Sequence, residues 1–171
     1  MRTAWWLGLA AAIATGAAAM PAEAAAPAAP RWTHTVSGGE NTAKYRERGI
    51  ELVFRCLGGS MELVLYVDTP VLDPDVQGRP TAYMALIIDD SQVYSFQGRL
   101  IKDATTTSIG LGTRGANDFA HFIVGATRSF LTSLLVAPPG PGSLNYNVLQ
   151  YPIAGAPEAI KAAYAGCGIP F

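Results

Sequence analysis

The chain has 171 residues, with 12 lysines and arginines against 13 aspartates and glutamates, which gives a formal net charge of −1. Because there is no basic stripe, nucleic acid is excluded as an expected partner. Half of the residues are hydrophobic and two are cysteines. This composition fits one globular domain that follows an apolar leader.

The N-terminal residues have the pattern of a secretory signal peptide. Arg2 supplies a positive charge, residues 5–20 form an apolar run, and Ala22-Glu23-Ala24 has the small-x-small spacing that signal peptidase recognises. The run is shorter than the roughly 20 residues of a membrane span. We therefore predict a signal peptide at residues 1–24, with an uncleaved anchor as the alternative, and an Ala/Pro linker at residues 25–30. No later stretch is long enough to span a membrane.

The remaining residues, 31–171, are predicted to form a single β-rich domain that is periplasmic or secreted. This length is sufficient to bury a core. In an exported chain, two cysteines favour a structural disulfide, so we predict a bridge between Cys56 and Cys167. Two unpaired buried thiols are the alternative.

The first part of the domain predicts a short strand followed by exposed segments. Residues 31–36 form this strand, with Trp32 as its anchor. Residues 37–41 have the composition of a loop. The charged residues 44–48 are expected to be solvated.

Residues 50–67 predict a β-hairpin. Apolar residues recur with a period of two from Ile50 to Cys56, and again from Met61 to Val67. The intervening Leu57-Gly58-Gly59-Ser60 supplies a tight turn. Cys56 shares the parity of the apolar residues, so its side chain is predicted to face the core.

The middle of the chain predicts a long loop and then three strands. Residues 68–80 are the loop, with three prolines and three aspartates. Residues 83–88 are apolar on both parities, as in a strand that is buried on both faces. Asp89-Asp90-Ser91 predicts a turn into a strand at 92–98, and the Thr-rich residues 105–111 predict another strand.

A helix is predicted over residues 117–127, with Asn117 as its N-cap. Its apolar residues recur at helical spacing: Phe119, Phe122, Ile123 and Ala126. Residues 129–137 and 144–151 then predict two further strands, separated by a proline-rich loop at 138–142.

A final helix is predicted over residues 157–167. Pro157 suits its first position and Gly168 suits its C-terminal cap. One face carries the apolar stripe: Ile160, Ala163, Tyr164 and Cys167. Cys167 and Cys56 therefore both lie on buried faces, which supports the bridge. The predicted fold is mainly β with minor α: an antiparallel sheet or β-sandwich, one inserted helix, and a C-terminal helix tied to a strand by the disulfide.

The search for catalytic and metal-binding motifs identifies no catalytic residue and no cofactor. G-x-S-x-G and C-x-x-C are both missing from the sequence. Residues 73–78 resemble the front of a calcium loop, but the twelfth position is Met84 instead of Glu. His34 and His121 lie on separate predicted elements, so we expect no metal site.

Residues 110–115 match G-x-G-x-x-G between a predicted strand and a predicted helix. A dinucleotide site also needs a βαβ unit and an acidic residue about 20 residues on. The region 130–140 contains neither Asp nor Glu. Such a loop often serves only to turn the chain, but binding of a small anion at residues 110–118, by Arg114 and Asn117, stays open.

Three stretches carry a resemblance to known proteins: Leu52 to Cys56, the helix-then-strand segment from Phe119 to Val136, and Tyr151 to Gly155 with its helix closing on Cys167. Their order resembles a loose group of small exported proteobacterial proteins. The group includes type VI secretion-associated periplasmic accessory proteins and invasion-associated locus B-like proteins. The resemblance implies an envelope protein with structural cysteines and no catalytic residues to carry over. The chain departs from the group at 68–80 and 138–142.

The sequence therefore predicts an exported non-enzymatic envelope protein, either a binding domain or an accessory domain. Its expected partner is another envelope protein. The alternatives are an exported, hydrolase-like enzyme whose site the sequence does not mark, and the small-anion binder at residues 110–118.

Overall fold

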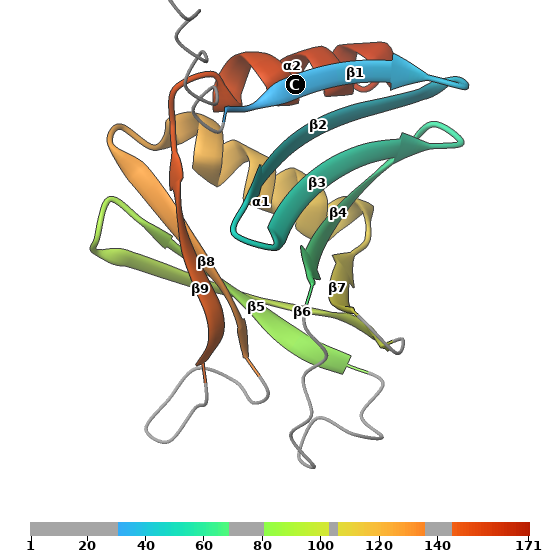
Figure 1. Ribbon diagram of the computed structural model, residues 1–171. Helices are drawn as coiled ribbons and strands as arrows, with labels where there is room; N and C mark the ends of the chain where they lie inside the picture. Colours follow the sequence, from blue (N-terminus) through green and yellow to red (C-terminus); the bar gives the residue numbers. More distant parts are fainter. Residues whose placement is uncertain (1–30, 69–80, 103–105, 136–144) are drawn as a thin grey trace, which may run out of the picture.

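The computed structural model describes residues 31–68, 81–102, 106–135 and 145–171. These residues form one open antiparallel sheet of nine strands, and two helices (Figure 1). The strands lie in the order β1-β2-β3-β4-β7-β6-β5-β8-β9. Their bounds are β1 Thr33–Ser37, β2 Glu40–Glu47, β3 Ile50–Leu57, β4 Ser60–Val67, β5 Thr81–Ile88, β6 Gln92–Lys102, β7 Thr107–Leu111, β8 Ser129–Leu135 and β9 Asn145–Pro152.

The predicted fold class is confirmed, in the form of a single sheet. The helices are α1 (Thr113–Gly125) and α2 (Ala156–Gly166). Among the described residues, no helix combines the length and the apolar character that crossing a membrane requires. The predicted signal peptide, the linker, most of the 68–80 loop and the 138–142 loop lie outside the described ranges.

Three successive hairpins build one end of the sheet. Each has a two-residue turn in which both residues adopt positive φ: Gly38-Gly39, Arg48-Gly49 and Gly58-Gly59. This geometry matches the right-handed twist of the flanking strands. The predicted hairpin over residues 50–67 is confirmed, and its register sets Cys56 opposite Met61.

Strand β2 corrects the predicted loop at residues 37–41 and shows that the charged segment at 44–48 is largely a strand, in which Arg46 is exposed as predicted. Because the turn uses only Gly38 and Gly39, the chain is already extended at Glu40. Ala43 and Tyr45 are buried in the core, while charged residues alternate with them on the opposite face. The charged side chains therefore lie on one face of strand β2, opposite the buried residues.

Both helices lie on the same face of the sheet, here called the inner face. The sheet curves around α1, which packs against β4, β5 and β7, while α2 packs against β1, β2 and β3 (Figure 1). The core between them includes Phe54 and Phe119, whose rings meet edge to face. Strand β5 was predicted to be buried on both faces, yet Tyr83 and Ile87 on its outer side are only half-buried.

Helix α1 begins four residues before the predicted start. Its N-cap is Gly112, and Asn117 lies inside the helix, which corrects the predicted cap. Gly112 and Gly115 had the composition of a loop, but Ala116, which follows them, is fully buried and packs the start of the helix on the core. Asn117 instead accepts a hydrogen bond from the Tyr164 hydroxyl at 2.9 Å.

Helix α2 lies close to its predicted bounds. Gly155 is its N-cap with φ of 80°, so Pro157 takes the second helical position instead of the first. At the other end Gly168 has φ of 71°. Its N–H donates to Ala165, and the N–H of Ile169 donates to Tyr164, the paired bonds of a Schellman C-cap.

The predicted disulfide is confirmed. Cys56 and Cys167 are joined, with an S–S distance of 2.02 Å and a Cα–Cα distance of 5.6 Å. The bond ties β3 to the C-terminal end of α2. As the two buried patterns indicated, α2 therefore lies across the inner face that carries Phe54.

Candidate functional site

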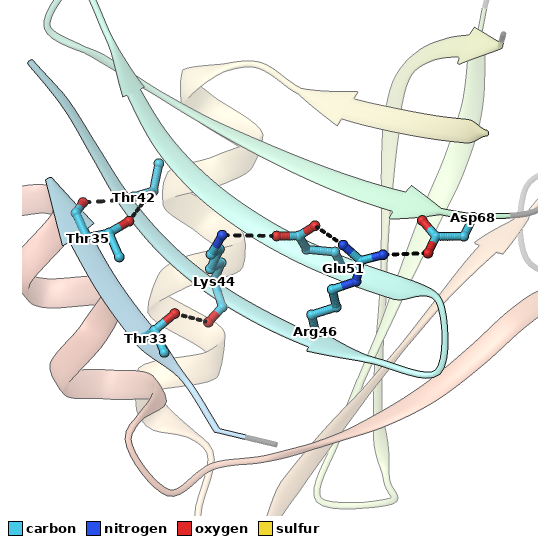
Figure 2. A network of polar contacts seen from close by, with 7 residues as sticks. All are labelled: Thr33, Thr35, Thr42, Lys44, Arg46, Glu51 and Asp68. Carbon is cyan, nitrogen blue, oxygen red and sulfur yellow. Dashed lines mark hydrogen bonds and ion pairs between the residues drawn. The ribbon is translucent and has the colours of Figure 1, made fainter. Parts of the chain in front are cut away.

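The outer face of the sheet, opposite the helices, carries rows of paired polar side chains. Figure 2 shows their beginning on β1, β2 and β3. Glu51 lies 3.6 Å from Lys44 and 3.8 Å from Arg46, and Arg46 reaches Asp68 at 2.6 Å. These side chains are partly exposed, so each ion pair contributes at most about 1 kcal/mol. They satisfy one another and leave few free groups on this part of the face.

The outer face is hollowed further along, where β7 lies between β4 and β6. We call this hollow the outer groove; its volume is about 500 Å³. Its lining comes from β3, β4, β6 and β7 and from the residues on either side of β7: Arg55, Glu62, Val64, Tyr66, Arg99, Ile101, Thr106, Ser108, Gly110, Leu111 and Gly112.

The groove exists because β7 presents small residues between the larger ones of its neighbours. The register is direct: Ser108 lies between Tyr66 and Ile101, and Gly110 lies between Val64 and Arg99. A Cβ added at Gly110 or at Gly112 would meet no atom within 4 Å, and neither has a positive φ. Neither packing nor backbone conformation therefore requires glycine there; its effect is to leave the groove open.

The polar groups of the outer groove differ in how far they are satisfied. Arg55 is committed, because its guanidinium donates to Glu62 at 3.1 and 3.3 Å and to the Tyr66 hydroxyl at 3.5 Å. Among the described residues, Arg99 forms no ion pair or side-chain hydrogen bond. Ser108 is only 7% exposed, and its hydroxyl likewise has no hydrogen-bond partner there.

The predicted anion-binding residues fall beside this groove. Gly110 and Gly112 of the predicted 110–118 loop line it. Arg114 is exposed in the first turn of α1 and does not line it, and Asn117 is held by Tyr164. Sequence reasoning missed Arg99 and Ser108, although the small residues at every second position from Thr106 to Gly112 were a visible signal.

A second hollow, the seam groove, lies between β2 and the β8–β9 pair, with a volume of about 710 Å³. Its polar groups already satisfy one another. Glu47 accepts from the Tyr45 hydroxyl at 2.8 Å and lies 3.4 Å from Arg48. Arg128 donates to the Asp89 carbonyl, and Gln150 donates to Ser129. Burial and then the Glu47 contacts raise the pKa of Tyr45 to about 12. The outer groove is the better candidate, because Arg99 and Ser108 line it and have no hydrogen-bond or ion-pair partner in the described ranges.

The two histidines lie apart from both grooves. His34 is exposed on β1, and His121 on α1 packs its ring against Phe171, with 4.6 Å between ring centroids. In the part of the chain that the structure describes, no three His, Cys, Asp or Glu side chains are grouped to hold a metal ion. The structure therefore identifies no metal centre there.

Comparison with known proteins finds no family model, no curated protein and no solved structure that matches this chain. The resemblance to small exported proteobacterial proteins thus stays a prediction. The outer groove and its free polar groups carry the functional argument.

Proposed function

We propose that this protein is an exported, non-enzymatic binding domain of the bacterial envelope, and that it binds through the outer face of its sheet. The observation that supports the proposal is the outer groove. Both helices cover the inner face, which leaves the groove open, and Arg99 and Ser108 in it have no partner among the described residues.

Export is supported by the disulfide and by the signal pattern of residues 1–24. A disulfide persists in oxidising compartments such as the periplasm and the extracellular space. The Cys56–Cys167 bond is compatible with both of these locations. We therefore propose a periplasmic or secreted protein whose partner is another component of the envelope.

One of the two alternative functions gains a specific observation. The small-anion binder was predicted at residues 110–118, and part of that loop, Gly110 to Gly112, lines the outer groove. The cation that serves the groove is then Arg99 on β6, in place of Arg114. The hydrolase-like enzyme stays a prediction, since no described contact favours it.

Affinity capture tests the proposed binding face. The mature protein, purified from the periplasm of an exporting bacterium, is used as bait for solubilised envelope components. The variant Arg99→Glu reverses a charge in the outer groove. Lys161→Glu reverses an exposed charge on α2 and serves as the matched control.

We expect one or more envelope components to be retained by the wild type and by Lys161→Glu, and to be lost with Arg99→Glu. Retention by all three proteins would place binding on another surface. Equal loss with both variants would show that the capture depends only on net charge.

A further inference from the structure

We propose that the outer groove binds a small organic carboxylate with an apolar body, and that Arg99 and Ser108 hold its carboxylate group. The inference rests on the proposed function, because it assigns a ligand class to the same face. It adds what the ligand is and which two residues select it.

The shape of the groove suits a small molecule. Its volume of about 500 Å³ lies in the range of small-ligand sites. The floor is Gly110 and Ser108 on β7, and the larger residues of β4 and β6 form the two walls. Glycine inside a strand weakens the strand, and open space above it allows a ligand to approach the backbone closely.

The hydroxyl of Ser108 gives the groove a specific polar point. Ser108 as a residue is 7% exposed and lines the groove, and its hydroxyl has no hydrogen-bond partner in the described ranges. No buried side-chain polar atom there lacks a partner, so this hydroxyl is open to the groove. A carboxylate oxygen above Gly110 would accept a hydrogen bond from it.

The charges favour a carboxylate over a phosphate. The groove is lined by two arginines and one glutamate, but Glu62 already neutralises Arg55. This leaves one uncompensated cation, Arg99, whose planar fork matches a carboxylate in two parallel hydrogen bonds. A dianionic phosphate would leave a negative charge without a partner beside Glu62.

The walls favour an apolar body. Ile101 is 51% exposed and faces Tyr66 across Ser108. A short alkyl or aryl group that packs against the outer parts of these two side chains, above the carboxylate at Ser108 and Gly110, would remove apolar surface from water. Arg99 would then orient the charged end of the ligand, and the groove walls would contact its apolar end.

Titration followed by ¹H–¹⁵N NMR of the mature protein tests the proposal. The probes are hexanoate, the neutral hexanamide and inorganic phosphate. We expect hexanoate to cause saturable shifts of the Arg99 Nε–H and of the amides from Ser108 to Gly112. Hexanamide and phosphate should bind at least about tenfold more weakly, the loss expected for one charge-assisted pair.

Three variants locate the site. Arg99→Gln should weaken hexanoate binding at least about tenfold, since it removes the charge-assisted pair. Gly110→Val should abolish binding by filling the groove. It should stay as stable as the wild type in thermal denaturation, because valine favours strands and its Cβ meets open space. Arg114→Gln, the matched arginine control, should bind like the wild type.

Several results would overturn the proposal: no saturable shift with hexanoate, binding that survives Gly110→Val, equal binding of hexanamide, tighter binding of phosphate, or dependence on Arg114 instead of Arg99. If hexanoate fails while envelope capture still depends on Arg99, the ligand class is wrong and the proposed binding face stands. If both fail, the proposed function fails as well.

Discussion

Asp89 shows how much a single turn residue can organise. It adopts a positive φ of 49° in the β5–β6 turn. Its carboxylate accepts from the backbone N–H groups of Thr127, Arg128 and Ser129 at 3.0, 2.8 and 3.3 Å, and from the Thr127 hydroxyl at 2.8 Å. Successive N–H groups of this kind form an anion-binding nest. The carboxylate thus fixes the connection between α1 and β8.

The first prediction concerns the pH dependence that Asp89 introduces. The N–H groups of Thr127 and then Arg128 hold the pKa of its carboxyl well below the ordinary value. Because the unfolded pKa is about 3.9, its stabilisation is present above that pH and is lost as the pH falls through the lower folded pKa. Asp89→Ala should therefore lower the free energy of unfolding at pH 7, and the deficit should shrink below about pH 4.

Denaturant unfolding at pH 7 and at pH 3 measures this deficit. Asp90→Ala is the control, since Asp90 occupies the same turn with φ of 64° and, among the described residues, makes no side-chain hydrogen bond. A deficit in Asp89→Ala that stays constant with pH would show that the carboxylate charge is not the cause.

The second prediction contrasts two glycines on neighbouring strands. A Cβ at Gly98 would lie 2.6 Å from Ile109 Cγ1 and 2.7 Å from the Gly110 carbonyl oxygen. Gly98→Ala should therefore cost about 1–3 kcal/mol of stability, as overpacking does. Gly110→Ala should cost nothing, because its Cβ meets open space. Urea unfolding of both variants measures the contrast, and equal stability of the two would contradict these contacts.

Among the elements, β3 and α2 are joined most strongly, by the disulfide. The bond closes a sequence separation of 111 residues, for which loop entropy gives about 4–5 kcal/mol. Tyr164 adds a link from α2 to α1 through Asn117. Burial raises the pKa of the Tyr164 hydroxyl well above its ordinary value, so the hydroxyl keeps the proton of this hydrogen bond even at pH ~10, where an ordinary tyrosine titrates. The C-terminal helix α2 is thus linked to the sheet by the disulfide and to helix α1 by the Tyr164 hydrogen bond.

The third prediction tests the disulfide. Cys56→Ser and Cys167→Ser should each lower the unfolding free energy by about 4–5 kcal/mol or less. The double variant should cost little more than either single one, because both remove the same bond. Denaturant unfolding gives the three values. Mass spectrometry of the wild type should show two hydrogens fewer than the reduced chain; additive losses or free thiols would refute the pairing.

At the scale of the whole molecule, Trp32 connects the two ends of the open sheet. It precedes β1, and its Nε1–H donates to the Pro152 carbonyl on β9 at 3.0 Å. Its ring lies 5.8 Å from that of Tyr45 on β2 and 6.1 Å from that of Phe130 on β8, measured between centroids. The sheet curves around α1 (Figure 1), and its two ends meet at the aromatic contacts of Trp32.

The fourth prediction concerns this closure. Trp32→Ala should cost about 3–5 kcal/mol, the usual loss for a buried aromatic residue. Trp32→Phe keeps much of the packing and should cost about 1 kcal/mol, the value of its hydrogen bond. Thermal and urea unfolding measure both. Val36→Ala on β1 is the control: Val36 is 64% exposed and should cost less than about 0.5 kcal/mol.

Local patterns determined most of the elements in advance. The alternation from Ile50 to Cys56, the Gly58-Gly59 turn and the stripe from Ile160 to Cys167 depend on residues close in sequence. The disulfide followed because both cysteines lay on buried faces of their elements. Strand β2 was missed because a two-residue glycine turn and an outward row of charges looked like a loop.

Only the tertiary structure decided where β7 lies and what that position creates. Its place between β4 and β6 sets Gly110 between Val64 and Arg99, and the pairing with β4 joins strands that are distant in the sequence. Sequence alone could therefore identify the glycine loop but assigned its charge to Arg114, the nearest arginine along the chain. The register of strand pairing creates the groove, because the small side chains of β7 become neighbours of the large ones of β4 and β6 only when these three strands pair.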